Sequence, residues 1–160
     1  MRAMRFLALA ATVATCGWPH AAHAQHPASG RERLTGAWHL VSLGETGPKG
    51  RLETVASLKG ALIYTRDGHM SVEIQYPDAS VSNEYVLHGY EASFGTYDVD
   101  PAAHTVTHHV EGSITRGLVG KTLVRSYRFS GRRLIIRSTR PEEHWQVTWE
   151  RDEPHANGTN

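Results

Sequence analysis

The feature that most constrains the fold is a series of short segments in which apolar and polar residues alternate, separated by turn signals. The clearest pair is 60–65 and 70–76, joined through Arg66-Asp67-Gly68-His69. Asp-Gly between apolar runs is typical of a β-hairpin turn. Every other residue from Met70 to Tyr76 is apolar, so one face of that strand should lie on a core and the other in solvent.

The same pattern recurs along the chain and predicts eight short antiparallel strands. Asp100-Pro101 and Ser130-Gly131 turn two further pairs of segments into hairpins. Regularly spaced strands of this kind indicate a sandwich or an up-and-down barrel, and eight strands can close around one small ligand. The expected strands are 36–43, 60–65, 70–76, 95–99, 105–111, 121–129, 133–139 and 144–151.

Three segments depart from the alternating pattern. Residues 44–50 contain three glycines and a proline, which predict a loop. Residues 51–58 are ambiguous between a strand and a loop edge that covers the mouth of a barrel. Ser82 can cap a short helix over 83–92, the one helix that the sequence favours within the folded domain.

The N-terminal residues have the pattern of a secretory signal peptide. Two arginines precede a short apolar run over 6–15, and Ala22-His23-Ala24 supplies the small residues of a cleavage site. We therefore expect residues 1–24 to be removed, a mature chain that begins near Gln25, and a periplasmic or secreted protein. Cys16 would leave with the signal; anchoring as a lipoprotein at Cys16 is an alternative, although Thr15 is bulkier than the usual preceding residue.

The remaining residues divide into a leader, one domain and a tail. We expect a flexible leader over 25–33, a single domain over 34–151 and a disordered tail over 152–160. The chain has 17 basic and 16 acidic residues, and two of the basic ones lie in the signal, so the mature formal charge is −1. That balance does not favour nucleic-acid binding. No later apolar stretch is long enough for a membrane span.

Two polar residues fall in apolar rows and mark a candidate site. His108 lies between Val106 and Val110 on one face of its strand, and Arg125 lies in the row that also carries Tyr127. A charge on a core face is costly unless it has a partner, a cavity or a ligand. Tyr97, Tyr127 and Tyr64 are inward-facing candidates for the same ligand site.

These residues leave three functional hypotheses open. Arg125 could hold an anionic or carbonyl group through its planar fork of donors, and His108 could donate a hydrogen bond to a small, largely apolar ligand. Alternatively, His108 and Arg125 could catalyse cyclisation or isomerisation by proton transfer. In the third, the protein is an envelope interaction protein whose barrel is packed shut, with Arg125 paired with a buried carboxylate or backbone carbonyls. Glu73 and Glu111, however, both fall on the outward parity.

The sequence gives little support for a metal site or a cofactor site. His104, His108 and His109 are close in the chain, but neighbours on a strand point to opposite faces and do not easily share one ion. The chain has no nucleophile elbow, no phosphate-binding glycine loop and no His-Glu-x-x-His, so we expect neither metal nor cofactor. Trp145 and Trp149 are expected in the core rather than in a ligand site.

A Gly-x-Trp opening and four further blocks of sequence, taken in order, resemble the lipocalin-like domain family of bacteria and fungi. They are a Gly-x-Trp opening at 36–38, the block 59–72 with its Tyr64, the blocks 94–97 and 107–113, and the closing Trp149-Glu150-Arg151. The resemblance covers 34–151 and implies an all-β, eight-stranded antiparallel up-and-down lipocalin-like barrel. It also implies that Arg151 lies across the indole of Trp38 and caps nearby carbonyls.

Overall fold

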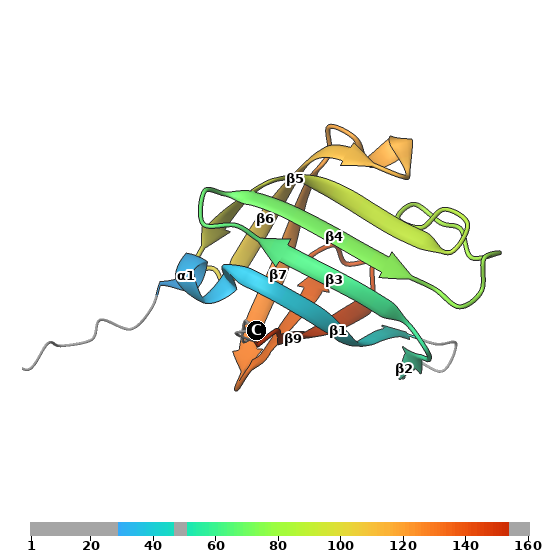
Figure 1. Cartoon of the computed structure of the whole chain (residues 1–160), viewed down its shortest axis with the longest axis horizontal. Coiled ribbons are helices and arrows are strands. Elements are labelled where there is room, and N and C mark those ends of the chain that lie inside the picture. Colours follow the sequence, from blue (N-terminus) through green and yellow to red (C-terminus); the bar gives the residue numbers. More distant parts are fainter. Residues whose placement is uncertain (1–28, 47–50, 154–160) are drawn as a thin grey trace, which may run out of the picture.

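The protein is a β-barrel with one short helix at its N-terminal end (Figure 1). The computed structural model describes residues 29–46 and 51–153. No helix in these ranges has the length and apolarity needed to cross a membrane. The elements are α1 (Gly30–Leu34), β1 (Gly36–Thr46), β2 (Leu52–Val55), β3 (Lys59–Tyr64), β4 (His69–Gln75), β5 (Tyr90–Asp100), β6 (Thr105–Ser113), a 3₁₀ turn (Arg116–Leu118), β7 (Thr122–Ser130), β8 (Arg133–Ser138) and β9 (Trp145–Arg151).

Consecutive antiparallel pairing from β3 to β9 builds the barrel, and β1 closes it by pairing with both β3 and β9. The eight predicted strands are therefore confirmed, and β2 is an additional one. β1 continues through Thr46, and its last four residues pair with β2. The predicted loop over 44–50 was wrong for 44–46, because these residues pair with β2. The Leu52 side chain packs against Gly44, where a Cβ would clash with it. Residues 47–50 lie outside the described ranges.

The predicted helix over 83–92 is wrong. Asn83 does accept hydrogen bonds from the N–H groups of Tyr85 and Val86, at 2.8 and 2.9 Å, as a capping residue would. His88 and Gly89, however, both have left-handed backbone conformations, with φ of 51° and 77°. Leu87 and Tyr90 exchange backbone hydrogen bonds across these two residues, so the chain makes a tight hairpin turn there and continues as β5.

Helix α1 plugs one end of the barrel. Its capping box joins Ser29 and Glu32, and Leu34 is fully buried. Arg151 lies 4.1 Å from the centre of the Trp38 ring and donates a hydrogen bond to the Thr35 carbonyl at 2.7 Å, which confirms the expected cation–π contact and carbonyl cap. Residues 30–33, assigned to a flexible leader from the sequence, are helical.

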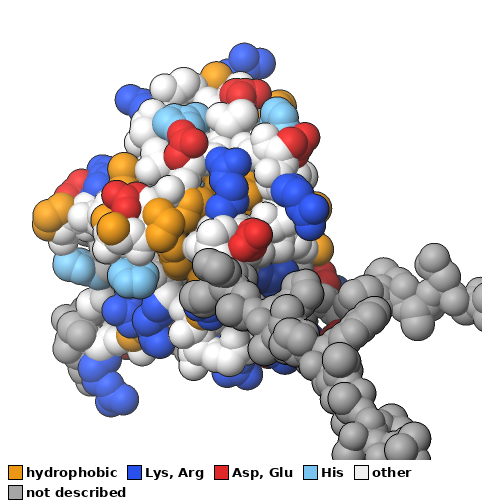
Figure 2. Space-filling model, turned by 90° about the vertical axis from the view of Figure 1, so that its left-hand side faces the viewer, with side chains coloured by type: hydrophobic (Ala, Val, Ile, Leu, Met, Phe, Trp, Pro, Cys, Tyr) orange, Lys and Arg blue, Asp and Glu red, His pale blue; other side chains and the backbone are white. Residues whose placement is uncertain are grey.

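Some expectations fall on residues outside the described ranges. They concern the signal peptide and its Cys16, the start of the leader, and the tail beyond residue 153. The barrel surface around α1 carries charged side chains of both signs and histidines, interspersed with small apolar patches (Figure 2). The basic side chains around β8 are largely paired, as in Arg133 with Glu150 and Arg132 with Glu153, which fits a solvated sheet edge.

Candidate functional site

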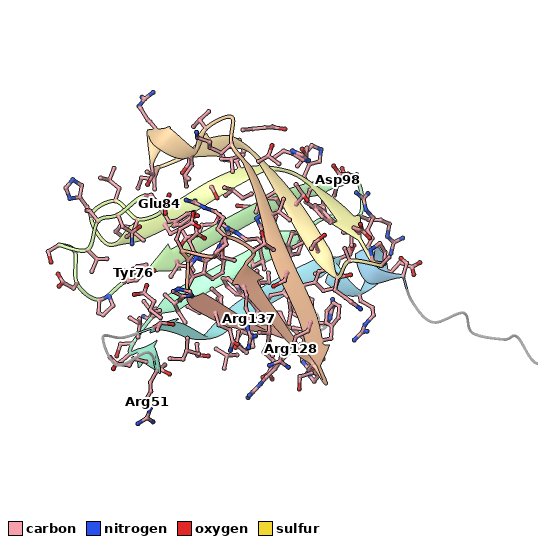
Figure 3. All side chains as sticks on the ribbon, turned by 180° about the vertical axis from the view of Figure 1, so that it is seen from behind. Arg51, Tyr76, Glu84, Asp98, Arg128 and Arg137 are labelled. Carbon is pink, nitrogen blue, oxygen red and sulfur yellow. The ribbon has the colours of Figure 1, made fainter. Side chains whose placement is uncertain are left out.

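A cavity of about 370 Å³ occupies the half of the barrel away from α1. Tyr76 and Glu84 mark this end of the molecule, and Asp98 marks the opposite end, beside α1 (Figure 3). The segment 83–86 lies across the cavity and contributes to its wall. The apolar and aromatic lining consists of Leu43, Leu62, Val72, Ile74, Tyr76, Tyr85, Val86, Leu118, Leu123, Ile136, Trp145, Val147 and Trp149. The polar lining consists of Glu45, Asn83, Glu84, Glu91, Ser93, His108, Arg125 and Glu143.

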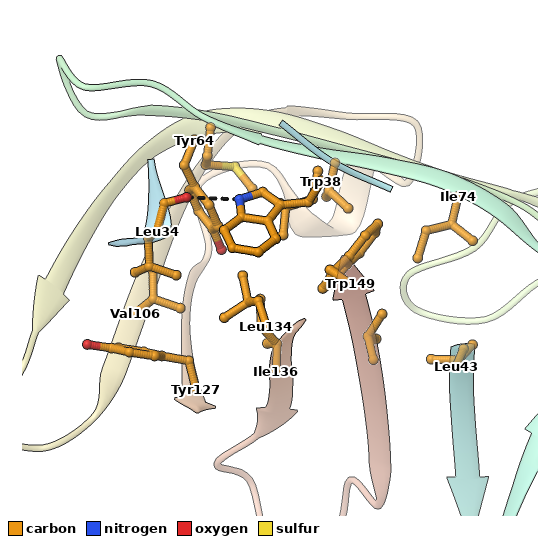
Figure 4. Close-up of a cluster of buried hydrophobic side chains, with 14 of the residues drawn as sticks. Leu34, Trp38, Leu43, Tyr64, Ile74, Val106, Tyr127, Leu134, Ile136 and Trp149 are labelled. Carbon is orange, nitrogen blue, oxygen red and sulfur yellow. Dashed lines mark hydrogen bonds between the residues drawn. The ribbon is translucent and has the colours of Figure 1, made fainter. Parts of the chain in front are cut away.

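The α1 half of the barrel is filled by side chains (Figure 4). The Trp38 indole donates a hydrogen bond to the Leu34 carbonyl at 2.9 Å, drawn as a dashed line in that figure. Tyr97 packs against the Tyr64 ring at 4.7 Å between centroids, and its hydroxyl donates to the Thr65 carbonyl at 2.8 Å. The ligand space is therefore confined to the other half.

The tyrosines proposed from the sequence lie beside the cavity rather than in its wall. Tyr64 and Tyr97 are 1% exposed and pack in the α1 half; Tyr127 packs edge-on against Phe129 there. None of the three lines the cavity. Trp145 and Trp149 were expected in the core rather than in a ligand site, but both line the cavity. The apolar face of β9 runs through both the packed and the hollow half of the barrel.

Arg125 lines the cavity and is 4% exposed. Contrary to the sequence expectation that it lacks an inward acidic partner, its Nη1 lies 3.2 Å from Glu143, which precedes β9. Nη1 also donates to Ser138 at 3.3 Å, and Nη2 donates to the Tyr85 hydroxyl at 3.1 Å. The guanidinium lies 4.7 Å from the centre of the Trp145 ring. Its Nε makes no hydrogen bond to the described residues, so this donor remains free for a ligand.

Glu143 is the most completely paired acidic group of the site. Its side chain is 7% exposed. It accepts hydrogen bonds from the Tyr85 hydroxyl at 2.7 Å and from the Trp145 indole at 3.0 Å. It also pairs with Arg125 and, at 2.6 Å, with Arg140. Burial acts to raise its pKa, but hydrogen bonds and the Arg125 charge outweigh burial and hold the pKa below its ordinary value. The Arg125 charge is thus balanced within the protein.

His108 is a neutral hydrogen-bonding group. Its Nε2 lies 2.6 Å from the Tyr64 hydroxyl, and burial, helped by the Arg125 charge, lowers its pKa to about 3. Burial also raises the pKa of Tyr64, so its hydroxyl keeps its proton. That proton has no other acceptor among the described residues, so Tyr64 donates to Nε2 and the His108 proton resides on Nδ1. Nδ1 has no described partner and can donate to a ligand.

Glu91 is a cavity residue that the sequence analysis missed. It lies on β5 opposite Ile74 of β4 and lines the cavity. Burial raises its pKa to about 7, while the Arg125 charge opposes the rise. The erroneous helix over 83–92 concealed it. Counting back from Tyr97 with period two gives Ser93 and Glu91, which was the signal available in the sequence.

Among the described residues, no three His, Cys, Asp or Glu side chains gather in an arrangement that could hold a metal ion. His109, which neighbours His108, points outward and bonds to Asp98 at 3.0 Å. The site is therefore built from hydrogen-bonding and charged groups set in an apolar and aromatic wall.

A closed antiparallel barrel, plugged at one end and hollow at the other, is an architecture with room for one small molecule. The profile of the lipocalin-like domain family matches residues 35–152, so the chain belongs to that family. No curated protein matches the chain.

The chain is also similar, at low identity, to several solved structures. A lipocalin-like protein from Bacteroides uniformis ATCC 8492 is 14% identical, over 75% of this chain and 99% of that one, with a TM-score of 0.46. A redesigned β-barrel is 13% identical, over 77% and 95%, with a TM-score of 0.43. A mutant of the fluorescent protein UnaG is 10% identical, over 77% and 99%, with a TM-score of 0.41.

Proposed function

We propose that this protein is exported and that its barrel binds a small, largely apolar ligand. The ligand carries a carbonyl or similar acceptor group, through which the protein orients it. The observation that carries the proposal is a cavity of about 370 Å³ in which two donors, Arg125 Nε and His108 Nδ1, have no partner in the described protein. The volume lies near the lower end of the range of ligand pockets, about 300–1,000 Å³.

The charge balance favours a neutral carbonyl over an anionic group. Arg125 is the only basic residue among the described residues that line the cavity, and it already faces the ionised Glu143, so a ligand carboxylate would add a second negative charge beside it. A carbonyl oxygen can accept from Arg125 Nε or His108 Nδ1 without changing the charge. Trp145 and Trp149 supply a flat aromatic wall for the apolar part of the ligand.

Binding without chemistry is favoured over proton transfer by His108. A group with a pKa of about 3 is neutral at physiological pH and has little tendency to take up a proton there. His108 is better suited to orient a ligand through the Nδ1 donor. The hypothesis of a barrel packed shut is disfavoured by the cavity.

Export is proposed from the N-terminal sequence alone, and it has its own test. The intact mass of the protein purified from the envelope or medium of its source should correspond to a chain that begins near Gln25. A lipid-modified product beginning at Cys16 would replace the soluble-export proposal with a membrane anchor.

A matched pair of probes tests ligand binding. 2-Acetonaphthone and 2-methylnaphthalene have the same ring system, but only the first carries a carbonyl, and quenching of the fluorescence of Trp145 and Trp149 reports occupancy. The ketone should bind about tenfold more tightly. Arg125→Met should abolish that preference, whereas Arg128→Met, an exposed residue on the same strand, should keep it. Failure of both probes to bind would overturn the proposal.

A further inference from the structure

Glu91 differs from the other acidic residues around the cavity. Glu143 is satisfied by surrounding donors, and Glu45 and Glu84 are exposed at the rim. Glu91 lies partly buried in the β5 wall and makes no hydrogen bond or ion pair with the described residues. The Glu91 carboxyl oxygens remain accessible from the cavity and have no donor among the described residues, so a bound molecule can supply the hydrogen bond that the protein does not.

We propose that Glu91 is a second polar subsite of the cavity, which binds a hydroxyl or N–H donor carried by the same ligand. The inference rests on the proposed function and narrows it: the ligand is an apolar molecule with an acceptor at one position and a hydrogen-bond donor at another. Arg125 and His108 take the acceptor, and Glu91 takes the donor. Ser93, two residues further along the same face of β5, also lines the cavity.

A neutral donor suits this subsite better than a cation. The Arg125 charge acts on Glu91, so it would repel a ligand ammonium in the same cavity. A metal ion is also disfavoured, because no cluster of three potential metal-ligating side chains is present in the described ranges. A hydroxyl or amide N–H satisfies the carboxylate without bringing a charge into the apolar wall.

The subsite makes ligand binding depend on pH. Since the free protein holds Glu91 with a pKa of about 7, a donor ligand should bind more tightly as pH rises through that value and the stronger acceptor, the carboxylate, forms. His108 does not titrate in this range, and the Tyr76 pKa is raised above it. The other charged or titratable groups around the cavity are Arg125, Glu143, Tyr85, Glu45 and Glu84.

The experiment compares 2-acetonaphthone with isomeric acetylnaphthols, in which a hydroxyl is placed at different positions of the second ring. We expect at least one acetylnaphthol to bind about tenfold more tightly than the ketone at pH near 8, with a smaller gain near pH 6. Glu91→Leu should remove the gain and Glu91→Gln should remove its pH dependence. Glu111→Gln, an exposed residue on β6, is the matched control and should change neither.

The outcomes separate this inference from the proposed function. If 2-acetonaphthone binds in an Arg125-dependent manner and no acetylnaphthol gains affinity, the Glu91 subsite is wrong and the proposed function stands. If neither class of probe binds, both are wrong. If the gain persists in a Glu91→Leu protein with native near-ultraviolet circular dichroism, the hydroxyl is bound elsewhere and the inference fails.

Discussion

Three polar side chains of the cavity differ in how completely the protein satisfies them. Arg125 is paired with Glu143 and keeps one free donor. His108 is bonded on one side of its ring by Tyr64. Glu91 has no partner in the described protein. The groups that remain available to bind a ligand are therefore the Glu91 carboxyl, Arg125 Nε and His108 Nδ1.

Glu91 should make stability depend on pH. Between its ordinary pKa of 4.5 and about 7, the folded protein retains a proton that the unfolded chain releases, so wild-type stability falls as pH rises through that window. Glu91→Gln removes this loss. The variant should gain about 2–3 kcal/mol over wild type between pH 5 and pH 8, as measured by urea unfolding. Glu111→Gln should show no such trend.

The Tyr64 hydroxyl should be a structural determinant of the His108 orientation. Tyr64→Phe leaves Nε2 of a buried histidine without its partner and should cost about 1–3 kcal/mol in the free energy of unfolding. Tyr90→Phe removes the hydroxyl of a half-exposed tyrosine and should cost far less. Equal losses in the two variants, measured by denaturant titration, would contradict the assigned hydrogen bond.

At the scale of elements, one carboxylate joins three parts of the chain. Glu143, in the turn before β9, bonds Tyr85 of the segment across the cavity and Arg125 of β7. Arg140, from the same turn, also pairs with Glu84 at 3.5 Å. Side-chain contacts, rather than strand pairing, therefore hold the segment 83–86 to β7 and to the turn before β9.

Replacing Glu143 and replacing Arg125 should lower the free energy of unfolding by different amounts. Glu143→Ala leaves the buried Arg125 without a counter-charge and should destabilise the fold by about 3–5 kcal/mol. Arg125→Met is expected to cost less, about 1–2 kcal/mol, because Glu143 keeps Arg140 and the Trp145 indole and methionine preserves volume. Chemical denaturation of the two variants gives the comparison, and a reversed order would contradict the account.

The sequence predicted the strands more reliably than the conformations of the segments that connect them. Period-two alternation placed His108 and Arg125 inward correctly, because that parity is a local property of a strand. Glu143 could not be assigned, since it lies in a turn whose position depends on where β8 and β9 meet. Glu91 was missed because Ser82 resembles the cap of a helix over 83–92, and only the conformations of His88 and Gly89 reveal the hairpin.

At the scale of the whole molecule, the barrel is solid at the α1 end and hollow at the other. Trp38, Tyr64 and Tyr97 are almost fully buried in the solid half, while the cavity faces the segment over 83–86. Packing in the solid half can hold the fold while the hollow half is shaped for a ligand. The proposed ligand space therefore lies apart from the packed half, although the Arg125–Glu143 pair contributes to stability in the hollow half.

Arg151 tests that division. Arg151→Met removes the contact with Trp38 and the caps on the carbonyls of Thr35 and Arg33, and should lower the free energy of unfolding by about 2–3 kcal/mol. Probe binding in the folded variant should be unchanged, because the substitution is remote from the cavity. Arg128→Met is the control for stability. Loss of ligand affinity in folded Arg151→Met would show that the halves are coupled.

The pairing of β1 with β9 also sets the timing of folding. These are the first and last strands of the barrel, and Arg151 reaches back to the Thr35 carbonyl beside α1. A chain delivered from its N-terminus can form the intervening hairpins early, but the ring stays open until its final strand arrives. Closure over such a sequence separation is slow, so β1 must remain unpaired on that edge, and exposed to wrong partners, until synthesis of the domain is complete.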